Sequence, residues 1–187
     1  MILITGIGND DIKYHNTRHN AGFYAIEAMR QVLRFEGFIA HTPLKRDRLL
    51  LSEVAIVRWG QEEVILLQRN QTPMNRAGDA VKRVYDRYDI DEFILFHDDL
   101  DIKLGEYKIQ KGKSPKGHNG VKSVEEAIGT KDFWRVRLGI DNRQGQDIPG
   151  EEYVLQKFKK EEREILNGAI IEACDDLIFT ELFEKWI

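Results

Sequence analysis

Two short segments of the chain, at residues 2–7 (ILITGI) and 92–98 (EFILFHD), are apolar at nearly every position. Strands that are covered on both faces show this continuous pattern, whereas half-exposed strands alternate between apolar and polar residues. Neither segment approaches the roughly 18 apolar residues that a membrane span requires. The two segments therefore predict central strands of a sheet with a layer of structure on each face.

The remaining periodic segments predict an alternation of strands and helices. Further strands are expected at residues 53–59, 63–68, 106–110 and 134–140, and helices at 23–33, 81–88, 121–128 and from Lys160 onward. The segment WGQEE (59–63) lies between two strands and predicts a hairpin, so the sheet should be mixed. We expect an α/β fold with a mixed, mostly parallel central sheet flanked by helices, a long C-terminal helix and a single domain over residues 1–187.

Composition limits the classes of function. The formal net charge is −4 and both signs are interspersed, so the chain is not predicted to be disordered, and any nucleic-acid site must be local. The single cysteine, Cys174, cannot form an internal disulfide and is expected to be a small buried hydrophobe in a reducing compartment. The N-terminal segment lacks the features of a secretory signal. These features favour a soluble, cytoplasmic protein.

Polar residues collect after both central strands and before two of the helices. The clusters are GIGNDD (6–11) with TRHN (17–20), FHDDLD (96–101), TPMNRAG (72–78) and PKGHNG (115–120). In sheets of this kind a ligand site usually lies at the carboxyl ends of the central strands. Asn20, Asn75 and Asn119 are also plausible helix N-caps, which is the structural explanation for each of them. The repeated asparagines at one sheet edge favour a shared site.

His19 is a candidate general base. A neighbouring carboxylate, from Asp98 or Asp99, would hold the imidazole in one tautomer and raise its basicity. The sequence offers no obvious serine or cysteine nucleophile, so a histidine that activates water directly is the simpler scheme. A role as a satisfied polar residue beside a helix start stays open for His19.

Two other kinds of site fit the sequence less well. The carboxylates of HDDLD (97–101) could bind a divalent metal ion, but Asp98 and Asp99 would face opposite sides of a continuing strand. GIGN (6–9) lacks the third glycine of a dinucleotide-binding turn. We therefore expect neither a metal nor an organic cofactor.

Six lysines surround the loop before residue 118. Phosphate-backbone contact is the functional explanation, and a merely solvated surface is the alternative. They are Lys103, Lys108, Lys111, Lys113, Lys116 and Lys122.

In order and spacing, the segments TGIGN, TRHNAG, MNRAG, HDDLDIKLG, KGHNGVKS and FWRVRLGI resemble bacterial-type peptidyl-tRNA hydrolases over nearly the whole chain. The resemblance implies a monomeric, metal-independent enzyme that binds tRNA and acts in translation. It would hydrolyse the ester between a peptide and the 3′-terminal ribose of tRNA.

The resemblance also implies roles for individual residues. His19 matches the catalytic base and Asp98 its carboxylate partner. The other matches are crevice residues for substrate and water (Asn9, Tyr14, Met74, Asn75, Asn119) and a basic residue linked to tRNA binding (Arg137). An inactive RNA-binding relative, similar to proteins that assist splicing, is the alternative function, and a metal-dependent hydrolase is a third.

The chain departs from the family pattern in three places. GNDD (8–11) replaces a G-N-P-G turn, and KGKSPKGHNG (111–120) replaces a Gly-rich run in a manner similar to some eukaryotic members. The second departure leaves a mitochondrial location as an alternative. A lysine expected after the RLGI strand falls near Gln146 or Asp147, so that tRNA contact is not carried over.

Overall fold

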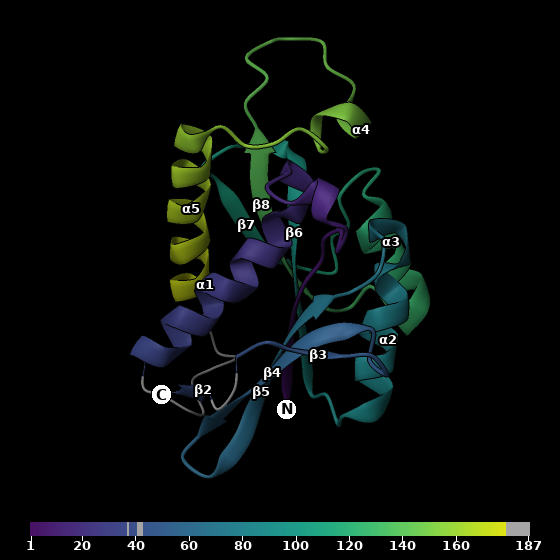
Figure 1. Cartoon of the computed structure of the whole chain (residues 1–187), viewed down its shortest axis with the longest axis vertical. Coiled ribbons are helices and arrows are strands. Elements are labelled where there is room, and N and C mark those ends of the chain that lie inside the picture. The colour runs from purple at the N-terminus through teal and green to yellow at the C-terminus, as the bar shows by residue number, and fades with distance from the viewer. Residues whose placement is uncertain (37, 41–42, 179–187) are drawn as a thin grey trace.

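One mixed sheet separates two layers of helices in the computed structural model, which describes residues 1–36, 38–40 and 43–178 (Figure 1). Within this part of the chain the sheet has eight strands, in the order β2-β4-β5-β1-β6-β8-β7, with β3 paired to β4. The strands are β1 (Ile2–Gly6), β2 (Ile39–Ala40), β3 (Lys45–Asp47), β4 (Ser52–Trp59), β5 (Glu62–Asn70), β6 (Glu92–Lys103), β7 (Tyr107–Lys111) and β8 (Trp134–Asp141).

The four central strands, β5, β1, β6 and β8, are parallel, and the pairings at both sides of them are antiparallel. The prediction of a mixed sheet is therefore confirmed, as is the hairpin between β4 and β5. β6 continues to Lys103, beyond its expected end at residue 98, because β8 pairs with it as far as Asp141. The acidic segment after residue 97 is consequently part of a strand.

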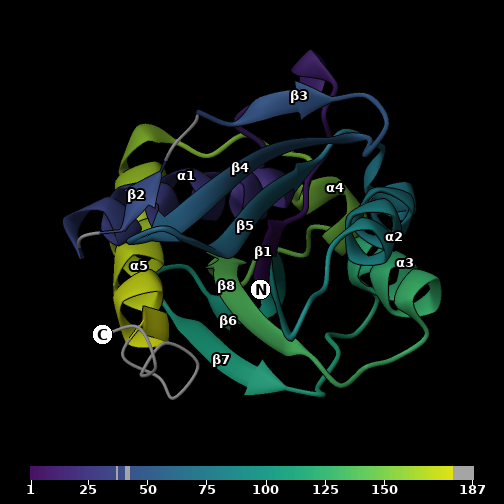
Figure 2. The ribbon, with the colours of Figure 1, turned by 90° about the horizontal axis from the view of Figure 1, so that it is seen from below.

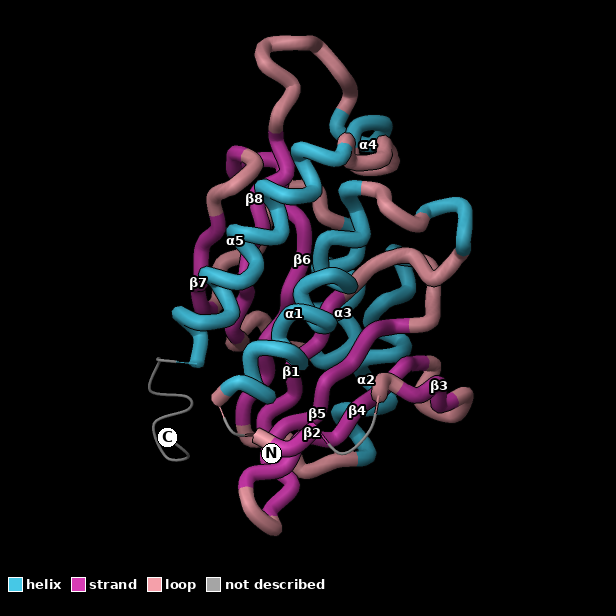
Figure 3. Tube along the Cα trace, turned by 60° about the vertical axis from the view of Figure 1, so that its left-hand side comes forward, coloured by secondary structure: helices cyan, strands magenta, loops and turns pink. Residues whose placement is uncertain are grey.

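The helices cover both faces of the sheet, as the view from below shows (Figure 2). The α-helices are α1 (Ala21–Phe35), α2 (Ala77–Arg87), α3 (Asn119–Ile128), α4 (Gly150–Tyr153) and α5 (Lys160–Ile178). α1 and α5 lie on one face and α2 and α3 on the other, and the tube view shows α1 and α5 in front of the sheet (Figure 3). None of the described helices is long and apolar enough to cross a membrane.

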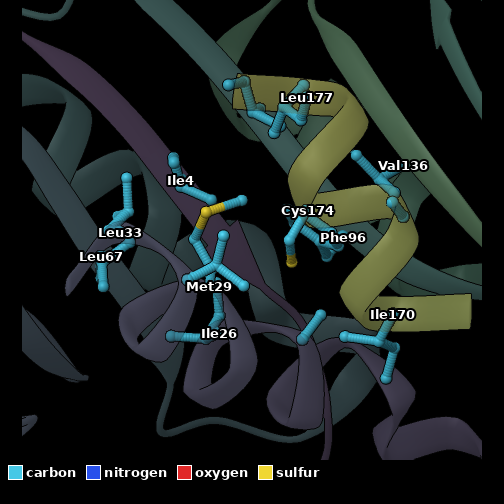
Figure 4. Close-up of a cluster of buried hydrophobic side chains, with 14 of the residues drawn as sticks. Ile4, Ile26, Met29, Leu33, Leu67, Phe96, Val136, Ile170, Cys174 and Leu177 are labelled. Atoms are coloured by element: carbon cyan, nitrogen blue, oxygen red, sulfur yellow. The ribbon is translucent and has the colours of Figure 1, made fainter. Parts of the chain in front are cut away.

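Two apolar clusters form the core, one on each side of the sheet. Under α1 and α5, Ile4 and Phe96 of the central strands pack with Met29, Ile170 and Cys174 (Figure 4). Cys174 is a free, fully buried thiol, as its sequence context predicts. Both clusters draw on alternate residues of β1 and β6, which is why these strands are apolar throughout.

Candidate active site

The polar clusters of the sequence meet in one crevice of about 970 Å³ at the carboxyl ends of β1, β5 and β6. The loops after these strands supply one wall, and the segment before α3 and the residues from α4 to 155 supply the others. Residues that line the crevice include Asn9, Tyr14, His19, Met74, Asn75, Asp98, Lys116, His118 and Asn119. Parallel strands place these side chains together although they lie up to 110 residues apart in sequence.

Two glycines bring the segment that carries His19 against the end of β1. A Cβ atom on Gly6 would lie 2.0 Å from the Gly22 carbonyl oxygen, and one on Gly22 would lie 2.5 Å from the Phe96 carbonyl oxygen. Only glycine allows this approach. The 3-10 turn η2 (Arg18–Asn20), which begins α1, therefore sits directly beside β1 and β6.

The backbone of η2 is also held from the other side, by the segment between α4 and α5. The Arg18 N–H donates to the Gln156 carbonyl oxygen at 3.0 Å, and the His19 N–H donates to that of Val154 at 2.8 Å. These bonds fix the backbone position of His19 relative to a wall of the crevice, since Val154 lines it.

A buried ion pair strengthens this attachment. Arg18 Nη2 donates to both carboxylate oxygens of Glu162, at 2.8 Å each, and the two side chains are only 5% and 7% exposed. The guanidinium also lies over the rings of Tyr153 and Phe158, at 4.3 Å and 4.9 Å from their centroids. Arg18 thus connects the turn of His19 to the first turn of α5.

His19 is hydrogen-bonded to the strand-end carboxylate, as the sequence predicts. Its Nδ1 lies 2.9 Å from Asp98 Oδ1 and 3.0 Å from Oδ2. An ionised carboxylate can only accept, so the proton of a neutral His19 is on Nδ1 and the lone pair is on Nε2. Among the described residues Nε2 has no hydrogen-bond partner, and the ring lines the crevice.

The electrostatics of the pair favour this protonation state. Burial opposes ionisation of Asp98, but the facing His19 and His118 imidazoles hold the pKa of its carboxyl far below the usual range. Burial lowers the pKa of His19, yet the charge and hydrogen bond of Asp98 outweigh it, so the pKa of His19 is raised above 6.5. Asp98 is therefore an anion, and His19 is a stronger base than a free imidazole.

His118 is a second partner of Asp98 that the sequence analysis did not single out, although it lies in the GHNG segment. Its Nε2 lies 3.1 Å from Asp98 Oδ1, and its Nδ1 accepts the Val121 N–H at 3.2 Å as the N-cap of α3. A backbone N–H can only donate, so Nδ1 carries the lone pair and Nε2 carries the proton. The start of α3 thus fixes the tautomer of His118 as a donor to Asp98.

This tautomer also bears on metal binding. Within the described part of the chain, His19, Asp98 and His118 place possible ligand atoms within 4.8 Å of one another. A metal ligand must offer a lone pair, and the nitrogen that His118 turns toward Asp98 carries a proton. The cluster is consequently better suited to proton transfer than to holding an ion.

His97 supports the cluster from inside the protein. It is fully buried, its Nδ1 donates to the Asp98 carbonyl oxygen at 2.7 Å, and its ring packs edge-on against that of His118. Burial, with the nearby His118, lowers the pKa of His97 to about 3. His97 is therefore a neutral packing residue, which its position in an apolar strand could have indicated.

Asn9 presents a hydrogen-bond donor to the crevice. The Met74 N–H donates to Asn9 Oδ1 at 2.8 Å, which identifies the oxygen and leaves Nδ2 without a hydrogen-bond partner among the described residues. Asn75 and Asn119 also line the crevice, and both are exposed. Three neutral amide side chains thus surround the His19–Asp98 pair.

The predicted capping roles of the asparagines are wrong. Asn20 precedes α1, but its side chain bonds the backbone of Asn9 and makes no capping bond. Asn75 lies within the 3-10 turn η3 (Met74–Arg76), and Asn119 is the first residue of α3, after its cap His118. Of the helices α1, α2 and α3, only α3 has a side-chain capping bond, and His118 makes it.

Arg137 does not line the crevice. Arg137 Nε donates to Asp99 Oδ2 at 2.7 Å, whereas the preceding carboxylate on β6, Asp98, binds His19 and His118. Arg137 Nη1 donates to Gln110 Oε1 at 2.8 Å. The guanidinium is buried and binds these partners, and the role of Arg137 in tRNA binding stays a prediction.

The six predicted lysines are all exposed and lie on β6, β7, α3 and the loop between β7 and α3. Lys116 lines the crevice, whereas Lys111 and Lys122 lie near Asp132 and Glu126, at 3.9 Å and 3.8 Å. Such exposed pairs are weak and leave the cations free to bind other anions.

Comparison with known proteins gives consistent similarities over the whole chain. The model of the family described as peptidyl-tRNA hydrolase matches residues 3–185. A protein of that name from Oceanobacillus iheyensis is 37% identical over 189 residues, covering 100% of this chain and 92% of the relative. One from Shouchella clausii is 38% identical over 171 residues, covering 90% and 87%. The crystal structure of peptidyl-tRNA hydrolase from Acinetobacter baumannii has a TM-score of 0.77 at 30% identity, covering 95% of this chain and 86% of that one.

Proposed function

Because this chain belongs to the peptidyl-tRNA hydrolase family, we propose that it cleaves peptidyl-tRNA with His19 as the general base. His19 Nε2 removes a proton from a water molecule in the crevice, and the water oxygen attacks the ester carbonyl carbon. Asp98 holds the ring in the required tautomer and stabilises the imidazolium that forms. The observation that carries this proposal is the 2.9 Å contact between His19 Nδ1 and Asp98 Oδ1, which leaves Nε2 for the water.

Neutral amides suit the charge that develops in this reaction. Attack by water places negative charge on the carbonyl oxygen, and Asn9 Nδ2 is a donor whose orientation the Met74 N–H fixes. Asn119 and Asn75 supply further amide donors and acceptors for the water and the peptide. Unlike a second carboxylate, an amide does not compete with His19 for the proton.

Collapse of the tetrahedral intermediate completes the reaction. The bond between the carbonyl carbon and the ribose oxygen breaks, and the proton on His19 Nε2 passes to the leaving oxygen. The products are a peptide with a free carboxyl group and a tRNA with a free 3′-terminal ribose, and the base returns to its neutral state. The scheme requires no group other than water and the residues of the chain.

The exposed lysines provide the surface for the RNA part of the substrate. Lys116 lies at the crevice, and Lys103, Lys108, Lys111, Lys113 and Lys122 extend from it over β6, β7 and α3. Phosphate contacts of this kind supply affinity and orientation, whereas the crevice selects the ester. The net charge of −4 restricts strong RNA attraction to such a local surface.

Retention of the complete proton-transfer arrangement argues against an inactive RNA-binding relative. Binding alone requires neither a histidine with a free Nε2 nor two imidazoles on one carboxylate. The relatives reported above are bacterial, which does not support a mitochondrial location. A cytoplasmic location and a monomeric state stay predictions.

The direct test is release of the N-blocked amino acid from N-acetyl-aminoacyl-tRNA by the native protein, His19→Ala and His15→Ala. His15 is exposed and lies in the same region, so His15→Ala is the matched control. The native protein and the control should release the amino acid, and His19→Ala should be slower by at least about 10²-fold with unchanged tRNA binding. Equal rates for the native protein and His19→Ala would refute the role of His19.

A further inference from the structure

Asn70, the last residue of β5, is a fully buried polar side chain next to the active site that has no part in the mechanism above. Its Oδ1 accepts the Gly8 N–H at 2.9 Å, and its Nδ2 donates to the Gly8 carbonyl oxygen at 2.8 Å. Nδ2 also donates to the carbonyl oxygen and hydroxyl of Thr72, at 2.9 Å and 3.1 Å. A buried amide is costly unless it is bonded in this way, and here it is fully used.

The two bonds to Gly8 continue the sheet by means of a side chain. The backbone pairing of β1 with β5 ends at Gly6 and Arg69, where the chain leaves β1. Beyond that point the Asn70 amide binds the N–H and the carbonyl group of Gly8, as a neighbouring strand would. Gly8 is thereby fixed although it lies outside the ladder.

The next residue is held in the same manner from the opposite side. Asn20 Oδ1 accepts the Asn9 N–H at 2.8 Å, and Asn20 Nδ2 donates to the Asn9 carbonyl oxygen at 3.1 Å. Two asparagine side chains therefore bind the backbones of two consecutive residues. The side chain of Asn9 is then oriented by the Met74 N–H, which belongs to the segment that follows Asn70.

We propose that Asn70 is a positioning residue for catalysis that sets the place of the Asn9 amide in the crevice. Asn70 holds the residue before Asn9, by binding Gly8, and the segment that leads to Met74, by binding Thr72, whereas Asn20 holds the Asn9 backbone itself. This inference rests on the proposed role of Asn9 as a donor to the reacting group.

The sequence of residues 8–11 explains why this chain needs side-chain hydrogen bonds to hold the turn. Residues 8–11 are GNDD, so no proline ring restricts the backbone of the turn. Side-chain bonds supply the restriction instead, from Asn70 to Gly8 and from Gln71 Nε2 to Asp10 Oδ1 at 2.8 Å. Both donors come from adjacent positions at the end of β5.

A double-mutant cycle separates positioning from stability. Asn70→Asp keeps the size of the side chain and the acceptor for the Gly8 N–H, but it replaces the donor that binds Gly8 and Thr72. Gln68→Glu is the matched control, since Gln68 is an equally buried amide two residues earlier on β5 that bonds Thr5, Ser52 and Ala80 rather than residues 8–11. Each change is also made in the Asn9→Ala protein.

Asn70→Asp should lower the single-turnover rate about 10-fold with little change in KM. In the Asn9→Ala protein the same substitution should lower that rate by less than about 2-fold. Gln68→Glu should lower the unfolding temperature but leave the rate within about 2-fold at a temperature where both variants are folded. If Asn70→Asp does not fold, Asn70→Ser serves in its place. If Asn70→Asp lowers the single-turnover rate equally in the native and the Asn9→Ala proteins, or does not lower it, the inference is overturned.

A measurement that does not depend on catalysis tests this inference separately from the proposed function. The side-chain ¹⁵N–¹H signals of Asn9, identified by their absence in Asn9→Ala, should shift in the Asn70 variant and not in Gln68→Glu. Unchanged Asn9 signals would contradict positioning even in an active enzyme. Absence of hydrolysis by the native protein would instead refute the proposed function, whatever the signals show.

Discussion

His118 Nε2 donates to Asp98 Oδ1 over 3.1 Å, on the same oxygen that His19 Nδ1 contacts at 2.9 Å. One carboxylate thus orients two imidazoles, and the tautomer of one of them is fixed by the start of α3. A donor in place of Asp98 Oδ1 would therefore disturb both imidazoles. Asp98 is therefore the residue whose chemistry is most constrained in the crevice.

Asp98→Asn should abolish most of the activity without removing the side chain. The oxygen of the new amide must remain at the Oδ1 position with the His118 donor, so the NH₂ group replaces Oδ2, which lies 3.0 Å from His19 Nδ1, and disfavours a proton on that nitrogen. The negative charge that stabilises the imidazolium is also lost, so His19 is a weaker base and kcat should fall by at least about 10²-fold with KM little changed. The kinetics of N-acetyl-aminoacyl-tRNA hydrolysis test this, and a reduction below about 3-fold would show that Asp98 does not set the tautomer.

Chelation of transition metals should leave the activity unchanged. The protonated Nε2 of His118 is a poor metal ligand, and the proposed mechanism uses water activated by His19 alone. Turnover in 1,10-phenanthroline should equal that in the non-chelating 1,7-isomer, with Mg²⁺ present throughout to maintain the tRNA fold. Selective inhibition by the chelating isomer, reversed by Zn²⁺, would instead favour the metal-dependent alternative.

The sequence predicted the parts of the site that depend on position along a strand or helix. Continuous apolar strands located the sheet edge, polar residues at that edge indicated His19 with Asp98 or Asp99, and the family resemblance selected Asp98. The bonds of Asn20 and Asn70 to the turn at residues 8–9 could not be predicted, because they depend on the register and spacing of separate segments. The ion pair of Arg137 with Asp99 could not be predicted for the same reason, since Asp99 lies on a neighbouring strand.

Loss of the ion pair behind His19 should destabilise the fold. Glu162→Ala leaves the Arg18 guanidinium buried without its carboxylate, and breaking such a pair on one side costs about 3–5 kcal/mol. The neighbouring Glu161 is exposed, so Glu161→Ala should change the free energy of unfolding by less than about 0.5 kcal/mol. Urea denaturation of both variants measures this difference, and equal stabilities would show that Arg18 does not depend on Glu162.

Removal of lysines from β7 and the following loop should affect binding rather than chemistry. The double variant Lys108→Ala, Lys113→Ala should have a higher KM. The slope of log KM against the logarithm of the salt concentration should fall by about 1 for each phosphate that is no longer neutralised. The rate at saturating substrate should stay unchanged, because neither residue lines the crevice. Lys82→Ala, on α2 and outside the six-lysine surface, is the control and should have no effect on KM. A fall in kcat at constant KM would contradict a role in RNA binding.

The pH dependence of the single-turnover rate tests the role of His19 most directly. His19 must be neutral to act as a base, and Asp98 raises its pKa above 6.5, so protonation should remove activity as the pH falls through that raised value. After subtraction of the rate with His19→Ala, the rate should be constant at high pH and fall about tenfold per pH unit below a midpoint above 6.5. A rate that is independent of pH between about 5 and 8 would contradict it.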